Sequence, residues 1–370
     1  MENVLDTALP ERLSRFSRIL FDPGMQHKKI AERLAKRLPQ AEWLEVEDGS
    51  SPGDLVSSGE KCLYLKRYKG RFLRFCPGTK FYRCCGYRIL HIGENCPLNC
   101  SYCILKAYFQ DNIQKVWANQ EDLKEELSRE LESNPDILYR MGTGEFTDSL
   151  ALEPLTGYSR DLIGFVSGFS NARLELKSKV ADLGWLDAVE YPEQILPAWS
   201  LNAPEVVQNE EMHVDSLEER LQAAAYCAGQ GFRVCLHFDP ILYYPGWEKG
   251  YARSIEMIFD YLTPEQIAYL SLGSFRGMPE LKDYISRNWP HSKYIYEEYV
   301  TGRDGKMRLL RPLRVKQFDY MVGLLRRYGL DRQIYFCMES DEVWKHVLGY
   351  TPDQLGGLDR HLLKLAFAIP

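Results

Sequence analysis

The eight residues Cys96-Pro-Leu-Asn-Cys100-Ser-Tyr-Cys103 carry three thiols that can all face one small inorganic core. Thiolates are soft ligands that bind iron–sulfur clusters, zinc and cuprous ions, and a [4Fe–4S] cluster normally takes four of them. A loop that supplies only three would leave one iron open to a small molecule. The spacing therefore predicts an iron–sulfur cluster at this loop.

Two alternatives remain open for these cysteines. Structural zinc sites usually take their ligands as two separated pairs, and the chain has no second CxxC pair. The other alternative is a trio of buried, inert cysteines, although three thiols on one loop rarely serve packing alone. Just upstream, Cys76, Cys84 and Cys85 could bind a second metal or supply a fourth ligand; the alternative is that they are packing or substrate-side thiols.

The composition is that of a globular protein. Of the 370 residues, 45% are hydrophobic and 26% are charged. No apolar run approaches the ~18 residues of a membrane span and no signal-peptide core is present, which predicts a cytoplasmic protein without a membrane partner. Ten cysteines then indicate reduced thiols and metal binding. The net charge of −6 argues against a generally basic nucleic-acid binder but allows a local basic patch.

Strand-like and helix-like segments alternate from residue 88 onward. We expect strands at 88–93, 137–141, 172–179, 195–202, 232–238 and 267–272. We expect helices at 122–132, 159–169, 216–229, 247–261 and 280–288. This alternation of about six β/α units predicts an α/β fold with a parallel sheet and right-handed crossovers, here a partial (β/α)6 barrel of the TIM type.

Two further parts flank the predicted barrel. Residues 1–87 form a mixed N-terminal α/β segment, 88–290 form the barrel, and 291–370 form a C-terminal extension that could close its open side. Basic residues interleave with aromatic ones at 66–75 and 293–314. That pattern suits contact with a nucleic-acid backbone and stacked bases, or a solvated basic edge strand.

The CxxxCxxC spacing of the cluster loop resembles the signature of the radical S-adenosylmethionine (SAM) superfamily. The loop follows a strand-like run, as in that superfamily, and an aromatic residue, Tyr102, directly precedes the third cysteine. The resemblance implies that Cys96, Cys100 and Cys103 hold a [4Fe–4S] cluster and that SAM binds beside it.

Residues at the carboxyl ends of the strands are candidates for the SAM site, because ligands bind there in barrels of this kind. Thr143-Gly144-Glu145 resembles the superfamily segment that binds the SAM amino group: Gly144 lets a ligand approach the backbone, and the Glu145 carboxylate can accept hydrogen bonds from an ammonium. Lys179 could pair with the SAM carboxylate. An ordinary turn and a solvated lysine are the alternatives.

Two later strands also end in polar residues. Ser200 and Asn202 fall on one face by the alternation of side chains in a strand, and could bond the ribose or carboxylate of SAM. Asp239 ends the following strand and could face adenine or substrate.

A closer resemblance covers residues 60–340. The order of motifs resembles the spore photoproduct lyase family of radical SAM proteins: the cluster loop, Lys179, Ser200-Leu-Asn202, Asp239-Pro-Ile and Gly246-Trp-Glu-Lys-Gly-Tyr251. The resemblance implies a partial barrel that holds a [4Fe–4S] cluster and SAM. The family's namesake repairs a crosslinked thymine dimer in DNA.

The chain departs from this family at the hydrogen donor. The lyase uses a cysteine just after the second strand, but residues 140–149 contain none, and Ile104 stands where the lyase has a tyrosine. Cys235 and Cys337, both on predicted strands, are candidate replacements for that donor. The alternative is that both are buried structural thiols.

These features predict a lyase-like radical SAM enzyme that cleaves SAM to a 5′-deoxyadenosyl radical, with a DNA photolesion as its first candidate substrate. An electron donor such as flavodoxin or ferredoxin is the expected partner. The missing donor cysteine and the acidic net charge favour a second hypothesis, a radical SAM enzyme that acts on another substrate. A non-catalytic iron–sulfur or zinc-binding module is the third.

Overall fold

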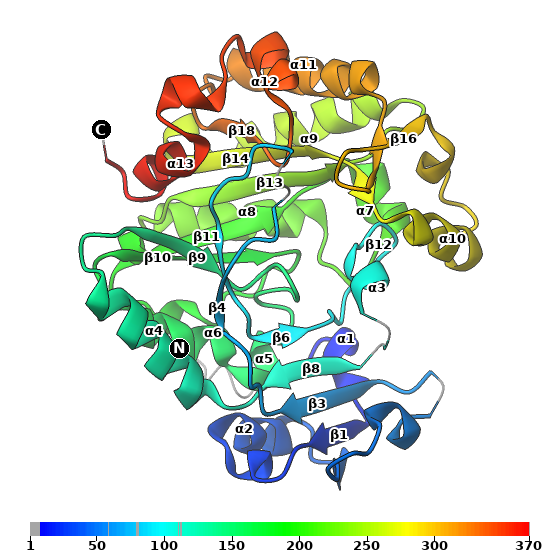
Figure 1. Ribbon diagram of the computed structural model, residues 1–370, viewed down its shortest axis with the longest axis vertical. Coiled ribbons are helices and arrows are strands. Elements are labelled where there is room, and N and C mark those ends of the chain that lie inside the picture. The colour runs from blue at the N-terminus through cyan, green and yellow to red at the C-terminus, as the bar shows by residue number, and fades with distance from the viewer. Residues whose placement is uncertain (1–7, 58, 79–80, 110, 112, 370) are drawn as a thin grey trace.

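The computed structural model describes residues 8–57, 59–78, 81–109, 111 and 113–369. They form two main sheets: one of eight strands fills the upper part of Figure 1, and one of five strands lies below it. None of the helices among these residues is long and apolar enough to cross a membrane.

The larger sheet contains the predicted partial barrel. Six of its strands neighbour one another in the order of the sequence and pair in parallel: β5 (Arg88–Leu90), β9 (Tyr139–Gly142), β10 (Ala172–Ser178), β11 (Ile195–Ser200), β13 (Val234–Ile241) and β14 (Ile267–Ser274). The alternating helices are α4 (Gln120–Ser133), α6 (Tyr158–Val166), α8 (Leu217–Gly229), α9 (Trp247–Tyr261) and α10 (Pro279–Asn288). The predicted fold class is therefore confirmed.

The strand β9 begins two residues later than the sequence predicts. The N–H of Ile137 bonds to the carbonyl of Asn134 at 3.1 Å, which continues the turn after α4, and the Ile137 side chain is 49% exposed. This apolar residue therefore belongs to the turn and not to the sheet.

Segments from outside 88–290 complete both edges of the larger sheet. From the C-terminal part, β18 (Ile334–Phe336) pairs in parallel with β14, and from the N-terminal part β4 (Leu73–Phe75) pairs antiparallel with β5. In the segment between β4 and β5, Arg83 forms a backbone bridge with Glu339, three residues after the end of β18. The two edges of the open barrel are thereby connected.

The smaller sheet has the strand order β2-β1-β3-β8-β6. Its N-terminal members are β1 (Arg18–Phe21), β2 (Glu42–Glu45) and β3 (Cys62–Lys66). The other two flank the cluster loop in sequence: β6 (Gly93–Glu94) precedes it, and β8 (Gln114–Trp117) follows it and pairs with β3. Both ends of the segment that contains the three cysteines are thus fixed in this second sheet.

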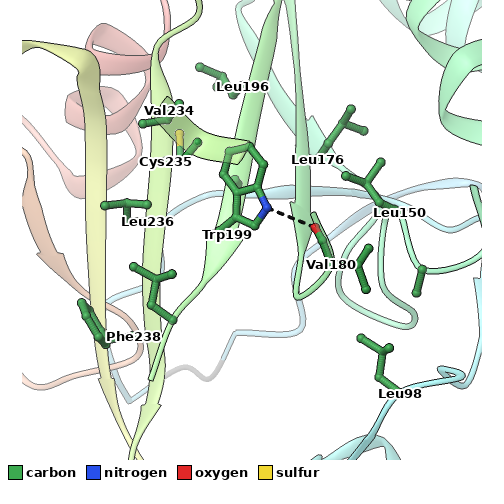
Figure 2. Packing of buried hydrophobic residues seen from close by; sticks show 14 of the residues in the cluster. Leu98, Leu150, Leu176, Val180, Leu196, Trp199, Val234, Cys235, Leu236 and Phe238 are labelled. Atoms are coloured by element: carbon green, nitrogen blue, oxygen red, sulfur yellow. Dashed lines mark hydrogen bonds between the residues drawn. The ribbon is translucent and has the colours of Figure 1, made fainter. Parts of the chain in front are cut away.

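A close-packed core holds the strand ends in place. Trp199 on β11 is fully buried, and its indole N–H donates to the Val180 carbonyl at 3.1 Å (Figure 2). Buried apolar residues surround it: Leu196 from the same strand, and Leu176, Leu236 and Phe238 from the neighbouring strands β10 and β13. Each such side chain contributes about 1.5–3 kcal/mol by leaving water. The adjacent polar residue, Ser200, is thus presented from a rigid strand.

Candidate functional site

A cavity of about 280 Å³ lies at the carboxyl ends of the parallel strands. Ten of the residues singled out from the sequence line it: Cys96, Cys100, Tyr102, Cys103, Gly144, Glu145, Lys179, Ser200, Asp239 and Cys337. Asn202 and Cys235 are not among its lining residues. The fold thus brings most of the predicted site into one chamber.

The cluster loop is held by a segment that the sequence did not single out. Its strand β7 (Asn99–Cys100) pairs antiparallel with β12 (Glu211–Met212). The N–H of Ser101 donates to the Glu210 carbonyl at 2.8 Å, and the Ser101 hydroxyl donates to the Glu210 carboxylate at 2.5 Å. Ser292 donates to the same carboxylate oxygen at 2.5 Å. The loop is therefore fastened on both its backbone and its side chains.

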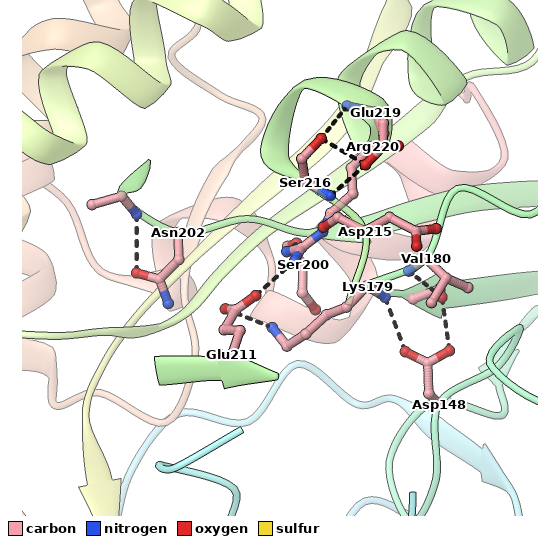
Figure 3. Close-up of polar contacts among 12 residues, drawn as sticks. Asp148, Lys179, Val180, Ser200, Asn202, Glu211, Asp215, Ser216, Glu219 and Arg220 are labelled. Carbon is pink, nitrogen blue, oxygen red and sulfur yellow. Dashed lines mark hydrogen bonds and ion pairs between the residues drawn. The ribbon is translucent and has the colours of Figure 1, made fainter. Parts of the chain in front are cut away.

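A buried carboxylate, Glu211, links this loop to the SAM-site candidates. It accepts a hydrogen bond from the Tyr102 hydroxyl, pairs with Arg220 at 2.7 Å and lies 3.4 Å from the Lys179 ammonium (Figure 3). Although burial opposes ionisation, Lys179 and Arg220 lower the pKa of Glu211 to about 2. Glu211 is thus a permanent anion that positions one cluster-loop aromatic ring and one candidate lysine.

A second carboxylate, Asp148, fixes the backbone at Lys179. It accepts from the Lys179 N–H at 2.9 Å and from the Ser178 hydroxyl at 2.7 Å. Asp148 also accepts from the N–H groups of Leu150 and Ala151. The ends of β9 and β10 are therefore locked together beside the cavity.

Glu145 and Gly144 lie where the sequence predicts, but both already contact Lys177. The Lys177 ammonium lies 2.5 Å from the Glu145 carboxylate. Burial opposes charging of Lys177, but Glu145 and Glu175 outweigh it and raise the Lys177 pKa. A side chain at Gly144 would begin 2.9 Å from the Lys177 carbonyl, so this position requires glycine for packing as well.

Asn202 lies behind the cavity and supports the segment after β13. Its carboxamide donates to the Pro240 carbonyl at 3.1 Å and accepts from the Tyr251 hydroxyl at 2.6 Å. The same hydroxyl accepts from the Leu242 N–H at 2.7 Å. Since β11 ends at Ser200, the alternation that placed Asn202 on the cavity face does not extend to it.

At the far side of the cavity, Asp239 and Arg276 form a two-pronged ion pair with both distances at 3.1 Å. Burial opposes ionisation, but Arg276 lowers the pKa of Asp239. The Cys337 sulfur accepts from Arg276 at 3.4 Å. Burial and the Asp239 carboxylate raise the pKa of Cys337 well above its usual range, so this cysteine stays a neutral thiol.

The other cysteines take different positions. Cys235 is fully buried on β13 and burial raises its pKa. Cys76 and Cys85 line the cavity, and the neighbouring Cys76 thiol together with burial raises the pKa of Cys84. Among the residues that the structure describes, no group of three or more His, Cys, Asp or Glu side chains is placed to hold a single metal ion.

The sequence analysis did not identify the charged residues Arg140, Glu175 and His237, which also line the cavity. Arg140 lies 3.4 Å from Glu175, which is also 3.4 Å from the Nε2 of His237, and the Nδ1 of His237 lies 3.0 Å from the Ser271 hydroxyl. Burial opposes ionisation of the Glu175 carboxyl, but His237 and Arg140 lower its pKa to about 2. The available signal was a charged residue inside an otherwise apolar strand, which faces the interior of a barrel.

The chain was compared with known proteins. The family model for spore photoproduct lyase matches residues 84–311. The spore photoproduct lyase of Clostridium acetobutylicum is 25% identical over 206 residues, which cover 55% of this chain and 61% of that protein. The lyase of Bacillus subtilis is 22% identical over 221 residues, which cover 58% of this chain and 64% of the relative. The matches thus span less than two thirds of these two relatives.

The fold also matches solved structures. A double mutant of spore photoproduct lyase with bound AdoMet and dinucleoside spore photoproduct superposes with a TM-score of 0.72 at 17% identity. The superposition covers 88% of this chain and 98% of the other. A spore photoproduct lyase complexed with the dinucleoside spore photoproduct gives the same TM-score over 87% of this chain. This chain therefore shares its overall fold with these structures.

Proposed function

Because this chain belongs to the spore photoproduct lyase family, we propose that it is a radical SAM enzyme in which Cys96, Cys100 and Cys103 hold a [4Fe–4S] cluster. The observation that carries the proposal is the shared chamber: all three cysteines line one cavity together with charged side chains from the ends of several strands. Three soft ligands on one wall suit a cluster that keeps one iron open for SAM.

The residues around the cavity suit the polar ends of SAM. Glu145 would bind the amino group, and Lys179 would pair with the carboxylate, since Glu211 already aims the lysine. Ser200, from the end of β11, would bond the ribose or carboxylate, and Asp239 would face the adenine or the substrate. With SAM bound, a [4Fe–4S] cluster supplies the reductive cleavage that yields a 5′-deoxyadenosyl radical.

The protein itself would position SAM and the substrate and would exclude water from the cavity. Apolar side chains of Ile89, Leu98, Leu105 and Phe146 share the cavity wall with the charged groups. A dry, rigid chamber keeps the reacting atoms near each other, which contributes most when they are held within about 3–3.5 Å. Asn202 contributes indirectly, because it supports the segment that follows β13.

For the return of a hydrogen atom we assign Cys337 in preference to Cys235. Cys337 follows β18 and lines the cavity at the carboxyl ends of the strands, on the same rim as the cluster loop. As a neutral thiol it carries the S–H bond that a substrate radical can take. Cys85 also lines the cavity, but it precedes β5 and does not lie at the carboxyl end of a barrel strand.

A DNA photolesion is the substrate that family membership favours. The described surface offers one suitable patch beside the cavity, on β4 and β5. The Phe75 ring is 69% exposed, Arg88 lies 3.3 Å from its centre, and Arg71 and Arg74 are nearby on the same edge. Such a combination suits phosphates and stacked bases.

The second basic segment, 293–314, is a weaker candidate for DNA contact than its sequence indicates. Arg308 pairs with Asp304 at 2.6 Å, and Arg314 pairs with Glu339 at 2.7 Å, and all four side chains are nearly fully buried. These arginines therefore stabilise the fold. Lys306 is the basic residue of this segment that lines the cavity, so it is the one that would contact a substrate bound there.

A radical SAM enzyme acting on another substrate is the second candidate. It is favoured by the absence of a cysteine in residues 140–149 and by the net charge of −6. The three-part division of the chain, the cytoplasmic location and an electron donor such as flavodoxin or ferredoxin stay predictions.

Anaerobic incubation of reconstituted protein with SAM, a reductant and ultraviolet-damaged DNA tests the proposal. Repair activity predicts that 5′-deoxyadenosine and restored thymine form together, and that damaged DNA binds more tightly than undamaged DNA with a strong dependence on salt. Formation of 5′-deoxyadenosine without restored thymine would select the second candidate. Protein that takes up zinc but neither iron nor sulfide would contradict both.

A further inference from the structure

A lysine that no motif assigns lies directly beside the cluster loop. Lys106 belongs to the short helix α3 (Leu105–Tyr108), which begins two residues after Cys103. Its ammonium donates to the Asn99 side-chain carbonyl at 2.6 Å, and Asn99 directly precedes Cys100. Lys106 therefore follows the cluster loop in sequence and also bonds back to a residue within it.

Two aromatic rings of the α10 region cover the same ammonium. It lies 4.7 Å from the centre of the Trp289 ring and 5.3 Å from that of Tyr284. Such contacts attract a cation to the face of the ring and hold it in one place. They also keep out water, which would otherwise screen the charge.

The charge of Lys106 is not paired with any carboxylate among the described residues. Within the part of the chain that the structure describes, no carboxylate lies at ion-pair distance from its ammonium; the groups that would become negative beside it are Cys103, Cys100 and Cys96, once they bind a cluster as thiolates. Burial lowers the pKa of Lys106, and these three cysteines oppose that shift. A half-buried cation is costly unless an anion compensates it.

Two other cations near the loop differ in this respect. Lys179 and Arg220 also act on Cys100, but both are paired with the buried Glu211 carboxylate. The single Glu211 carboxylate therefore offsets one of these two charges before any ligand binds, whereas Lys106 has no carboxylate at ion-pair distance. Lys106 is the cation near the loop for which a negatively charged cluster would be the natural partner.

We propose that Lys106 raises the reduction potential of the [4Fe–4S] cluster by placing an unbalanced positive charge next to its thiolate ligands. This inference rests on the proposed function. Adding an electron makes a cluster more negative, and a fixed nearby cation stabilises the reduced form over the oxidised form. Net charge, hydrogen bonds and exposure are the factors through which a protein sets such potentials.

The test is the midpoint potential of the reconstituted cluster, measured by EPR during a redox titration without SAM. Lys106→Gln keeps a donor for Asn99 but removes the charge, and Lys106→Arg keeps the charge. The matched control is Lys282→Gln, because Lys282 on α10 also lies over an aromatic ring, that of Tyr296 at 5.5 Å. Iron and sulfide content and the circular dichroism spectrum verify that each variant is assembled and folded.

We expect Lys106→Gln to shift the midpoint to a more negative potential, with Lys106→Arg close to the wild type and Lys282→Gln unchanged. The difference should persist at high salt, since a half-buried charge is poorly screened. An unchanged midpoint in Lys106→Gln, or an equal shift in Lys282→Gln, would overturn the inference. So would failure of Lys106→Gln to hold iron and sulfide, which would assign the lysine to assembly.

The proposed function fails separately, if the wild-type protein assembles no iron–sulfur cluster at all. If instead the cluster forms and the variants share one potential, the enzyme assignment stands and only the role of Lys106 is lost.

Discussion

Replacement of Glu211 by Gln should destabilise the protein by about 3 kcal/mol at neutral pH. The change leaves Arg220, which like Glu211 is fully buried, without its anion. Breaking one side of a buried ion pair typically costs about 3–5 kcal/mol. The pKa of Glu211, which falls from its ordinary 4.5 to about 2 in the folded protein, gives a similar magnitude of about 3 kcal/mol.

The pH dependence of this effect has a definite sign. Because the folded pKa is depressed, the stability is fully present above pH ~4.5 and is lost as the pH falls toward ~2. The free energies of unfolding of the wild type and of Glu211→Gln should therefore converge in that range. The assay is urea denaturation followed by tryptophan fluorescence and circular dichroism, whose agreement establishes a single transition.

Glu125→Gln provides the control. Glu125 also pairs with an arginine at 2.8 Å, Arg129, but both side chains are at least 70% exposed. Exposed pairs of this kind contribute about 0.3–0.5 kcal/mol. If Glu211→Gln costs no more than this control, the buried carboxylate does not hold the cluster loop and the SAM-site lysine together, and the reasoning is refuted.

Three further predictions concern other parts of the structure. Tyr251→Phe should cost about 1–3 kcal/mol in urea denaturation, because it leaves the Leu242 N–H unpaired and removes one of the two donors to the Asn202 carbonyl, while the affinity for SAM stays unchanged. A loss of SAM binding without a loss of stability would return Asn202 to the SAM site. Burial raises the pKa of Glu153 to about 7, so the free energy of unfolding should fall by about 3 kcal/mol as the pH rises from ~4.5 to ~7. A Glu153→Gln variant that shows a similar fall would contradict this prediction. In deuterated buffer, Cys337→Ala should abolish solvent-derived deuterium in the product and Cys235→Ala should not; deuterium retained in Cys337→Ala would exclude it as the donor.

The barrel was predictable because its signal is local. Apolar strands and amphipathic helices alternate, and the six strands pair in the order in which they occur in the chain. The cysteine loop was predictable for the same reason, since its three thiols lie within eight residues. Their placement on one cavity wall follows from the strand that precedes them.

The residues that the sequence missed depend on contacts between distant segments. Glu211 reaches the cluster loop only because β12 pairs with β7, and two-residue strands leave no periodic pattern. The sequence predicts a strand at Cys337, and β18 lies directly before this residue; only the pairing of β18 with β14 depends on a contact between distant segments. For Asn202 the alternation rule was extended past Ser200, where the strand ends, so its side chain points to the Pro240–Tyr251 segment instead.

The central claim is that three cysteines of one loop hold a cluster that cleaves SAM. It is tested most directly by quantifying 5′-deoxyadenosine after anaerobic reconstitution and reduction with SAM, in the wild type and in a variant with Cys96, Cys100 and Cys103 replaced by Ala. The account predicts that the nucleoside forms in the wild type and is absent from the variant. The claim would be contradicted if wild-type protein that holds a full complement of iron and sulfide formed no 5′-deoxyadenosine.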